Sequence, residues 1–282
     1  MYLVAIVISL VVEWLFVSLE SLRRTDWLRI WHDRLRAHVP ERWWNTPLGP
    51  LVVAIPPLAL IAIVFGLLSA VWGLLGFLFA VAVLLYSLGP RNLHADVERY
   101  LSAREAADDN ESRWYASQMV SAPLPETMPA LDVAVERAVF VQAHERLFGV
   151  IFWFLVLGPV GALLYRIAAV LRAQDTATPG NPGFTESVRH LHAILAWVPA
   201  RLCLIGYALA GNFVDAMARL REVNHTWADG SERVLTEGGR AALRADAPAD
   251  QTAVAEAFDL VKRTLFVWLV VIALLVLARV VP

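Results

Sequence analysis

Residues His144–Arg166, which read HERLFGVIFWFLVLGPVGALLYR, have the composition of a membrane-spanning segment with charged ends. No charged side chain occurs in the nineteen residues from Leu147 to Tyr165. As an α-helix this run would cover roughly 28 Å, about the thickness of one hydrocarbon core. The pair Gly158-Pro159 interrupts its middle, because proline lacks the backbone N–H that a helix interior needs. We therefore predict a broken membrane span over residues 147–166.

The composition indicates that the bilayer is the main solvent of this chain. Of its 282 residues, 58% are apolar and eleven are tryptophan, whereas soluble chains contain about 45–50% apolar residues. We expect an all-α, polytopic membrane protein, one integral domain over residues 1–282 with five to six transmembrane helices. The formal net charge of −2 gives no electrostatic reason to bind nucleic acid. The single cysteine, Cys203, has no intrachain partner for a disulfide or a cysteine-based metal site.

Four further segments are expected to enter the bilayer. Residues 1–19 form the first span, which lacks the basic start and the cleavage site of a signal peptide and is therefore retained. Residues 51–88 carry no charge and contain Pro56-Pro57. One helix over them would be about 57 Å long, too long for one bilayer, so we predict a tight transmembrane hairpin. Residues 188–211 form a span or a re-entrant helix, and residues 264–282 form the last span.

Polar regions separate these segments, and their arginines predict which side they occupy. Residues 20–50 contain six arginines, together with four tryptophans of the kind that favours the headgroup region. Residues 91–146 and 212–263 are the other large polar regions. Because arginine is enriched in cytoplasmic loops, we place all three regions in the cytoplasm and the N-terminus outside. With six spans, the C-terminus would also lie outside.

An amphipathic helix is predicted where the second polar region begins. In RNLHADVERYLSARE, Leu93, Val97 and Tyr100 share an apolar face. Four charged residues are then expected elsewhere on its circumference: Arg91, Asp96, Glu98 and Arg104. The acidic run 108–111 lacks the glycine and the twelfth-position glutamate of a calcium loop, so we predict a solvated loop there.

Charged residues at the predicted span ends are the candidates for a binding site. Glu13 lies within the first span, where a carboxylate is costly unless it faces protein or water. It is either a functional group or a protonated or water-reached carboxyl. Gln142, Glu145 and Arg146 stand at i, i+3 and i+4 on one helix face. They either cap the span or hold a phosphate or amide of a ligand. Arg201 is either paired inside the protein or extends to the headgroups.

Sequence motifs for catalysis and for metal binding are absent. The chain contains no GxxxxGK[ST], GxGxxG, HExxH or GxSxG pattern. His190 and His192 stand at i and i+2, and therefore face apart on a helix. The sequence accordingly predicts no metal, no cofactor and no catalytic residue.

The stretches FWFLVLGPVGALLYR and AWVPARL resemble the CobD/CbiB superfamily of membrane proteins. Its synthase members carry a similar FW-rich span, a Gly-Pro-Gly-Ala-Tyr-Arg run and an N-Y-[IL]-P-A-R-L segment. The resemblance extends weakly over nearly the whole chain, including RNL…VERYL. The matching positions are Phe152, Trp153, Gly158, Pro159, Gly161, Ala162, Tyr165, Arg166, Pro199, Ala200, Arg201 and Leu202.

Within that superfamily the chain looks most like the AmpE family. The resemblance rests on the length of the chain, the Glu-Trp pair in the first span, residues 144–166, the WVPARL segment and the final span. The resemblance implies a multi-pass protein of the bacterial inner membrane, encoded beside a muropeptide amidase and associated with β-lactamase induction. It does not indicate which protein is the partner.

Departures from the synthase pattern argue against synthase chemistry. Synthases carry three acidic patterns that this chain lacks. In place of E-N-T-x-D-G it has Val-Gln-Ala-His-Glu-Arg at 141–146, and in place of N-T-L-D it has Ala-Ala-Val-Leu at 168–171. In place of the paired aspartates it has His-Ala at 192–193. Most groups suited to hold Mg²⁺ and a nucleotide are therefore replaced. We expect a non-enzymatic signalling or sensor protein. The alternative is a divergent transferase or amide-forming ligase of the cobinamide-phosphate synthase type. Transport is weaker, because no inverted repeat pairs two broken spans.

A small-molecule ligand, a muropeptide or a nucleotide-like compound, would meet charged residues at the membrane boundary. The pocket hypothesis requires that these residues converge on one cavity. The ligand-binding candidates are Glu13, Arg91, Glu98, His144, Glu145, Arg146, Arg166 and Arg201.

Overall fold

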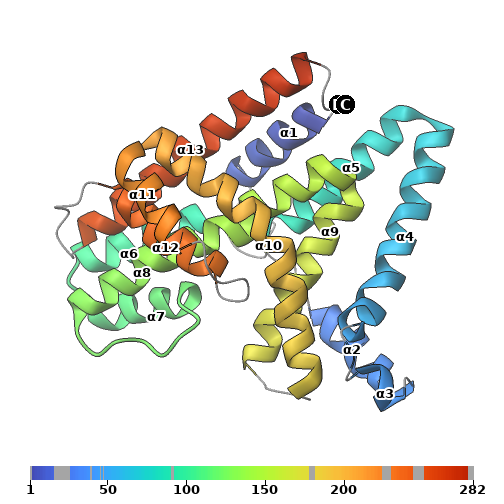
Figure 1. The fold of residues 1–282 in the computed structure, drawn as a ribbon, viewed down its shortest axis with the longest axis horizontal. Coiled ribbons are helices and arrows are strands. Elements are labelled where there is room, and N and C mark those ends of the chain that lie inside the picture. The colour runs from blue at the N-terminus through green and yellow to red at the C-terminus, as the bar shows by residue number, and fades with distance from the viewer. Residues whose placement is uncertain are drawn as a thin grey trace. The chain divides into compact units, whose positions relative to one another are not determined.

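The computed structural model describes residues 2–15, 26–38, 40–44, 46, 48–89, 92–177, 182–223, 230–243 and 251–278. Within these ranges the regular structure is entirely helical (Figure 1), which confirms the all-α prediction. The helices are α1 (Tyr2–Leu15), α2 (Asp26–His38), α3 (Glu41–Trp44), α4 (Gly49–Val71), α5 (Gly73–Ser87), α6 (Leu93–Glu105), α7 (Asp109–Met119), α8 (Met128–Ala143), a π-helix (His144–Phe148), α9 (Gly149–Ala177), α10 (Pro182–Ala210), α11 (Phe213–Val223), α12 (Gly230–Ala242) and α13 (Gln251–Leu277).

The chain is a polytopic membrane protein whose apolar helices associate with the lipid bilayer. Four helical segments are long and apolar enough to cross a membrane: Gly49–Val71, Met128–Gln174, Pro182–Ala210 and Gln251–Leu277. Two shorter apolar helices cover Tyr2–Glu13 and Gly73–Ser87. Large apolar side chains on α4, such as Leu60, Ile63 and Leu67, are more than half exposed. Such a surface is stable in hydrocarbon, whereas in water it would be a large unpartnered apolar patch.

Two compact units make up the molecule. The first contains Met1–Pro90, Gly149–Ala196 and Arg279–Pro282, and the second contains Arg91–Phe148 and Trp197–Ala278.

Prolines in α4 create the site on which α2 is attached in the first unit. Pro57 has no N–H, so it cannot bond the carbonyl oxygen of Val53, four residues earlier. The indole Nε1 of Trp31 donates to that oxygen at 3.1 Å. A surface helix thereby satisfies a backbone group that the proline leaves without its intrahelical donor.

The α9 segment folds back on itself in the first unit (Figure 1). Gly158 has φ 66° and ψ −150°, a conformation outside the helical region. A Cβ atom at Gly161 would collide with the carbonyl oxygen of Trp153, and one at Gly149 would collide with the ring of Tyr165. In a continuous helix these pairs would stand about 12 and 24 Å apart. The two halves of α9, before and after Gly158, are therefore antiparallel neighbours rather than one rod.

The core of the first unit lies between these helices. It joins α2, α3, α4, α5, the second half of α9 and the start of α10 through buried apolar side chains. Its members are Leu28, Trp44, Val53, Ala54, Val83, Leu163, Ile167, Val170, Leu171, Phe184 and Val188.

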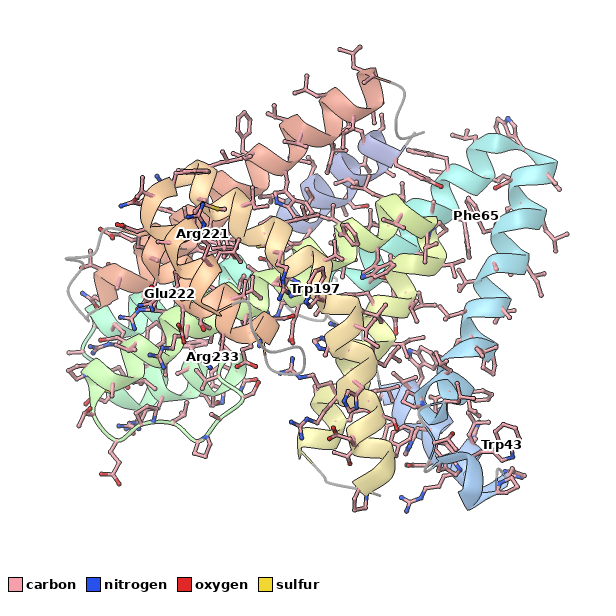
Figure 2. The ribbon with its side chains drawn as sticks, viewed as in Figure 1. Trp43, Phe65, Trp197, Arg221, Glu222 and Arg233 are labelled. Atoms are coloured by element: carbon pink, nitrogen blue, oxygen red, sulfur yellow. The ribbon has the colours of Figure 1, made fainter. Side chains whose placement is uncertain are left out.

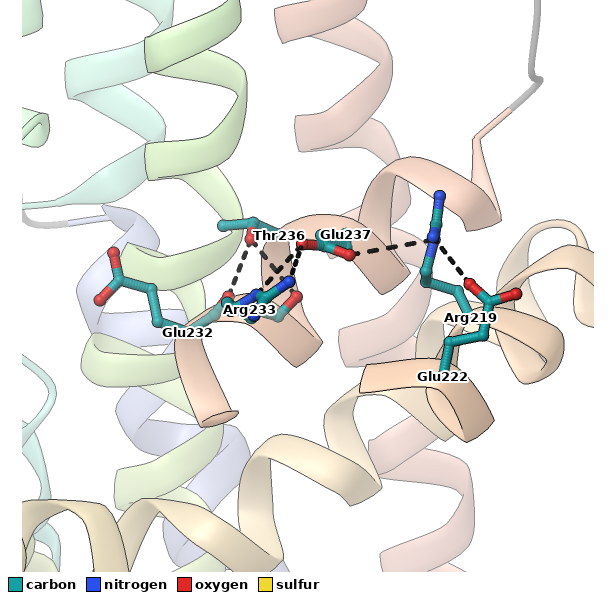
Figure 3. Close-up of polar contacts among 6 residues, drawn as sticks. All are labelled: Arg219, Glu222, Glu232, Arg233, Thr236 and Glu237. Carbon is teal, nitrogen blue, oxygen red and sulfur yellow. Dashed lines mark hydrogen bonds and ion pairs between the residues drawn. The ribbon is translucent and has the colours of Figure 1, made fainter. Parts of the chain in front are cut away.

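In the second unit, α12 is held close to α8 and α10 by two glycines. A Cβ at Gly238 would collide with the side chain of Leu204, and a Cβ at Gly239 would lie 2.8 Å from the ring of Phe140. Ion pairs on the outer side of α12 link Glu237 to Arg233 and to Arg219 of α11, and Arg219 also pairs with Glu222 within α11 (Figure 3). These pairs are solvent-exposed and contribute little stability.

The acidic run 108–111 is not a loop, contrary to the prediction. Asp108 is the N-cap of α7, and its side chain accepts from the Glu111 N–H at 2.9 Å. Asp109 and Glu111 lie in the first turn, where negative charge is favoured by the helix dipole. The residues that suggested a solvated loop are thus a helix start signal.

Candidate functional site

One face of α6 carries three polar side chains that point into the second unit. Asp96, Tyr100 and Arg104 stand at i, i+4 and i+8, so they share a face. Asp96 and Tyr100 are both fully buried. Asp96 therefore lies on the same buried face as Tyr100, and the prediction that it lies elsewhere on the helix is wrong. Its burial is possible because a partner, which the apolar periodicity does not reveal, neutralises its charge.

That partner is Arg146. Its Nη1 lies 2.9 Å from Oδ2 of Asp96, and neither side chain is more than 8% exposed. Its Nε donates to Oε1 of Gln142 at 2.8 Å, and Gln142 in turn donates to the carbonyl oxygen of Met119 at 3.0 Å. The polar face predicted for Gln142 and Arg146 thus exists. These hydrogen bonds connect α6 and α7 to the helix end that leads into residues 144–166.

A second buried pair joins the far end of α6 to α8. Nε and Nη2 of Arg104 donate to the two carboxylate oxygens of Asp132 at 3.0 and 2.9 Å, and the Tyr100 hydroxyl donates to the same carboxylate at 2.6 Å. Burial and then the bond to Asp132 raise the pKa of Tyr100 well above its usual range. The bond to Asp132 also raises the pKa of Arg104. The two pairs have opposite polarity, with acid on α6 in one and on α8 in the other, so they fix the antiparallel register.

A third pair attaches α12 to α8. Nε of Arg240 lies 3.1 Å from Oε1 of Glu136, whose side chain is 3% exposed. Three buried carboxylates of this unit, Asp96, Asp132 and Glu136, are therefore each neutralised by an arginine of the same chain.

The π-helix lies where this polar network meets the apolar stretch. It covers His144–Phe148 and buries His144, Arg146 and Phe148, whereas Glu145 is partly exposed. A π turn inserts one residue into the helical repeat, which rotates the following side chains relative to those before it. Such turns often mark functional sites.

The remaining candidates are divided between the two units. Glu13 and Arg166 are buried in the first unit. Glu98 is exposed in the second and pairs with His94 at 3.2 Å. Arg201 lies over the Trp197 ring at 4.0 Å and donates to the Trp197 carbonyl at 3.0 Å. Trp197 is labelled in Figure 2. Arg91 lies outside the described residues. Convergence of these side chains on one ligand site stays a prediction.

Sequence reasoning missed Asp132, Glu136 and Arg240 as members of the network. The available signal was the spacing of Asp132 and Glu136, at i and i+4 on a helix that is otherwise mostly apolar. Arg240 had no such signal, because it comes from a helix distant in the sequence.

The FW-rich stretch contacts the helix that carries the second family motif. Pro199 has no N–H for the carbonyl oxygen of Leu195, and Nε1 of Trp153 donates to that oxygen at 2.9 Å. The tryptophan of the FW-rich stretch thus satisfies the backbone group left by the proline of WVPARL. Trp31 does the same for Pro57.

Comparison with known proteins identifies the family. Residues 1–281 match the family described as "Regulatory signalling modulator protein AmpE". The chain belongs to the AmpE family. No solved structure matches this AmpE-family chain.

Two curated relatives of this AmpE-family chain are described as "Cobalamin biosynthesis protein CobD". The protein of Stutzerimonas stutzeri is 27% identical over 220 residues, which cover 75% of this chain and 70% of the relative. The protein of Chromobacterium violaceum is 30% identical over 167 residues, covering 58% of this chain and 53% of the relative. These matches fit a CobD/CbiB-related superfamily.

In this AmpE-family chain, positions where synthases carry acidic motifs are filled by packing side chains. Ala168, Ala169, Val170 and Leu171 are all buried, and the last two belong to the core of the first unit. His192 is buried with its ring 5.9 Å from that of Tyr165. Among the described residues, no group of three or more His, Cys, Asp or Glu side chains is placed to hold a metal ion.

Proposed function

We propose that this protein is a signalling protein of the bacterial inner membrane, which modulates β-lactamase induction or the response to muropeptide perturbation without synthase chemistry. The family description, a regulatory signalling modulator, supports the signalling role. The structural observation that carries the proposal is the internal pairing of Asp96, Asp132 and Glu136 with arginines.

This pairing favours a scaffold over a phosphoryl-transfer site. Enzymes of that kind use carboxylates to hold Mg²⁺, which neutralises charge that develops on the phosphates. A carboxylate already bound to an arginine would first have to leave it, and breaking a buried pair costs about 3–5 kcal/mol. The carboxylates here stabilise helix packing instead.

Deletion and complementation in an inducible host test the signalling role. We expect loss of the chain to change the ratio of β-lactamase activity with and without a β-lactam inducer, together with muropeptide levels. Re-expression of the wild-type chain should restore both. Unchanged induction and unchanged muropeptides in the deletion strain would refute the proposal.

Glu145 and Arg201 are the groups that we propose for ligand contact in this role. Both are partly exposed in the second unit, unlike Arg146. Glu145→Gln and Arg201→Lys should alter induction while the protein accumulates normally. Wild-type induction in both variants would remove them from the proposed site.

The alternative is a divergent transferase or amide-forming ligase, and the two relatives described as CobD favour it. Thermal unfolding of the purified protein in detergent, with ATP or GTP and Mg²⁺, separates the two. A bound nucleotide would raise the midpoint by mass action. We expect no shift; a concentration-dependent rise would favour the enzyme.

A further inference from the structure

We infer that the apolar stretch 147–165 enters and leaves the bilayer on the same side, so that residues 167–177 and 182–187 lie on the side of α2 and α3, which belong to the basic segment 20–50. A single crossing would put residues 167–177 and 182–187 on the opposite side. The inference does not depend on the proposed function, and it rests on three contacts within the first unit.

The first contact is the fold-back of α9. The collisions that a Cβ would make at Gly161 with Trp153 and at Gly149 with Tyr165 place the two halves side by side, with Gly158 at the turn. The positions pair symmetrically about the turn, as in any antiparallel hairpin. Position 165 therefore returns to the level of position 149.

The second contact joins the start of α10 to the basic segment. Oγ of Ser187 donates to the carbonyl oxygen of Thr46 at 3.1 Å. The ring of Phe184 lies 5.2 Å from that of Trp44 and 5.0 Å from that of His32. Thr46 lies just before α4 in the sequence, so these contacts lie at the end of α4 that adjoins the basic segment. The chain has thus returned to this side by residue 184.

The third contact places the tip of the hairpin. A Cβ at Gly158 would lie 3.2 Å from the Tyr2 hydroxyl, and the Tyr2 ring is 5.2 Å from that of Phe154. Tyr2 is at the start of α1, and the basic segment follows the other end of α1 in the sequence. The tip therefore lies at the end of α1 that is farther from that segment along the chain. Residues 149–157 rise roughly 14 Å, so the hairpin reaches into the apolar layer and returns.

Sidedness determines where a ligand or partner would reach this part of the chain. Arg172 follows the hairpin, and Glu186 and Arg189 form an ion pair at the start of α10. If the arginine-rich segment 20–50 is cytoplasmic, then these charged groups face the cytoplasm. A partner that recognises them would then approach from the cytoplasm and not from the periplasm.

Labelling of single cysteines with a membrane-impermeant maleimide tests the inference in a Cys203→Ala background. Glu186→Cys is the test position, because its side chain is 56% exposed. Arg36→Cys marks the basic segment, and Trp72→Cys, at the exposed turn between α4 and α5, marks the opposite end of α4. Labelling is compared between intact spheroplasts and inside-out vesicles.

We expect Glu186→Cys to label in the same preparation as Arg36→Cys and in the opposite one to Trp72→Cys. Labelling of Glu186→Cys together with Trp72→Cys would overturn the inference. A second measurement keeps the fold-back itself testable. A short bifunctional maleimide should cross-link Gly149→Cys to Tyr165→Cys, as detected by mass spectrometry. A single straight helix, which holds these positions about 24 Å apart, would give no cross-link and would contradict the hairpin.

Discussion

Two tryptophan side chains explain how the apolar part of this protein tolerates prolines within its helices. A buried carbonyl group without a donor costs about 1–3 kcal/mol, and no water is available in hydrocarbon to satisfy it. Trp31 donates to Val53 beside Pro57, and Trp153 donates to Leu195 beside Pro199. Each indole thus offsets a cost created by proline and, in doing so, fixes a contact between two helices.

Substitution of Trp31 should therefore depend on Pro57. We expect Trp31→Phe to destabilise the protein by about 1–3 kcal/mol, because the Val53 carbonyl loses its donor. In a Pro57→Ala background the same change should cost less, since the backbone N–H of the introduced alanine can bond that carbonyl. A double-mutant cycle on unfolding free energy in detergent measures the difference. Trp43→Phe is the control, because that side chain is exposed. Equal costs in both backgrounds would contradict the explanation.

The Asp96–Arg146 pair offers a second test on single side chains. Arg146→Met leaves a buried carboxylate unpaired and should cost about 3–5 kcal/mol. The double variant Asp96→Leu with Arg146→Met removes both charges and should recover most of that loss. Thermal unfolding of the purified variants checks the order of stability. A double variant as unstable as the single one would show that Arg146 stabilises the fold by some other contact.

Tyr100 should make the unfolding free energy depend on pH in the alkaline range. Its pKa is raised in the folded state by burial and by the bond to Asp132, whereas in the unfolded chain it ionises near its ordinary value of about 10. Below that pH its contribution is constant. Above it the unfolded chain binds fewer protons, so the unfolding free energy falls by up to about 1.4 kcal/mol per pH unit. Between pH 8 and 11 the unfolding free energy of Tyr100→Phe should fall less steeply than that of the wild type. Equal slopes would show that Tyr100 does not cause the pH dependence.

Helix α9 shows what local sequence can and cannot predict. The Gly158-Pro159 pair predicts a break, because glycine permits positive φ and proline removes a donor. It does not predict the direction that the chain takes after the break. That direction is set by close approach at Gly161 and Gly149, which is visible only once both halves are placed.

Glycine substitutions distinguish the turn from ordinary helical positions. Gly158→Ala should cost about 1–3 kcal/mol, because its φ and ψ are accessible almost only to glycine. Gly161→Ala should also destabilise, through collision with the Trp153 carbonyl. Gly66 in α4 is the matched control, since a Cβ there meets nothing within 4 Å. Gly66→Ala should be neutral or slightly stabilising. Thermal unfolding that ranked Gly66→Ala with the other two would contradict the turn geometry.

Helix α6 marks another limit of prediction from sequence. Its length and existence follow from apolar periodicity, and Asn92 caps its start. The burial of Asp96 does not follow, because periodicity assigns charged residues to the outside. Its pairing with Arg146, fifty positions later, offsets the cost of that burial. No local sequence pattern predicts the π-helix either.

For the molecule as a whole, the composition predicts the fold class and the family resemblance predicts the family. Neither predicts what the polar side chains do. The apolar fraction exceeds that of soluble chains, and the uncharged runs are long enough to cross a bilayer, so together they predict a multi-pass helical protein. The shared polar face of Gln142 and Arg146 was also found from the sequence, and its place at the membrane boundary stays a prediction. The roles of these side chains were not found from it, because a ligand site and a packing network use the same arginines and carboxylates. The pairing seen in the second unit supports a packing role for Asp96 and Arg146.

Signalling without synthase chemistry is tested most directly by the β-lactamase induction ratio in a deletion strain that expresses the Asp96→Leu, Arg146→Met double variant. We expect wild-type induction when the variant accumulates to the wild-type level, because the pair supports the fold and does not contact a ligand. A variant that accumulates and unfolds like wild type, yet fails to restore induction, would show that these charges act on a ligand or in a reaction, which contradicts a role in packing alone.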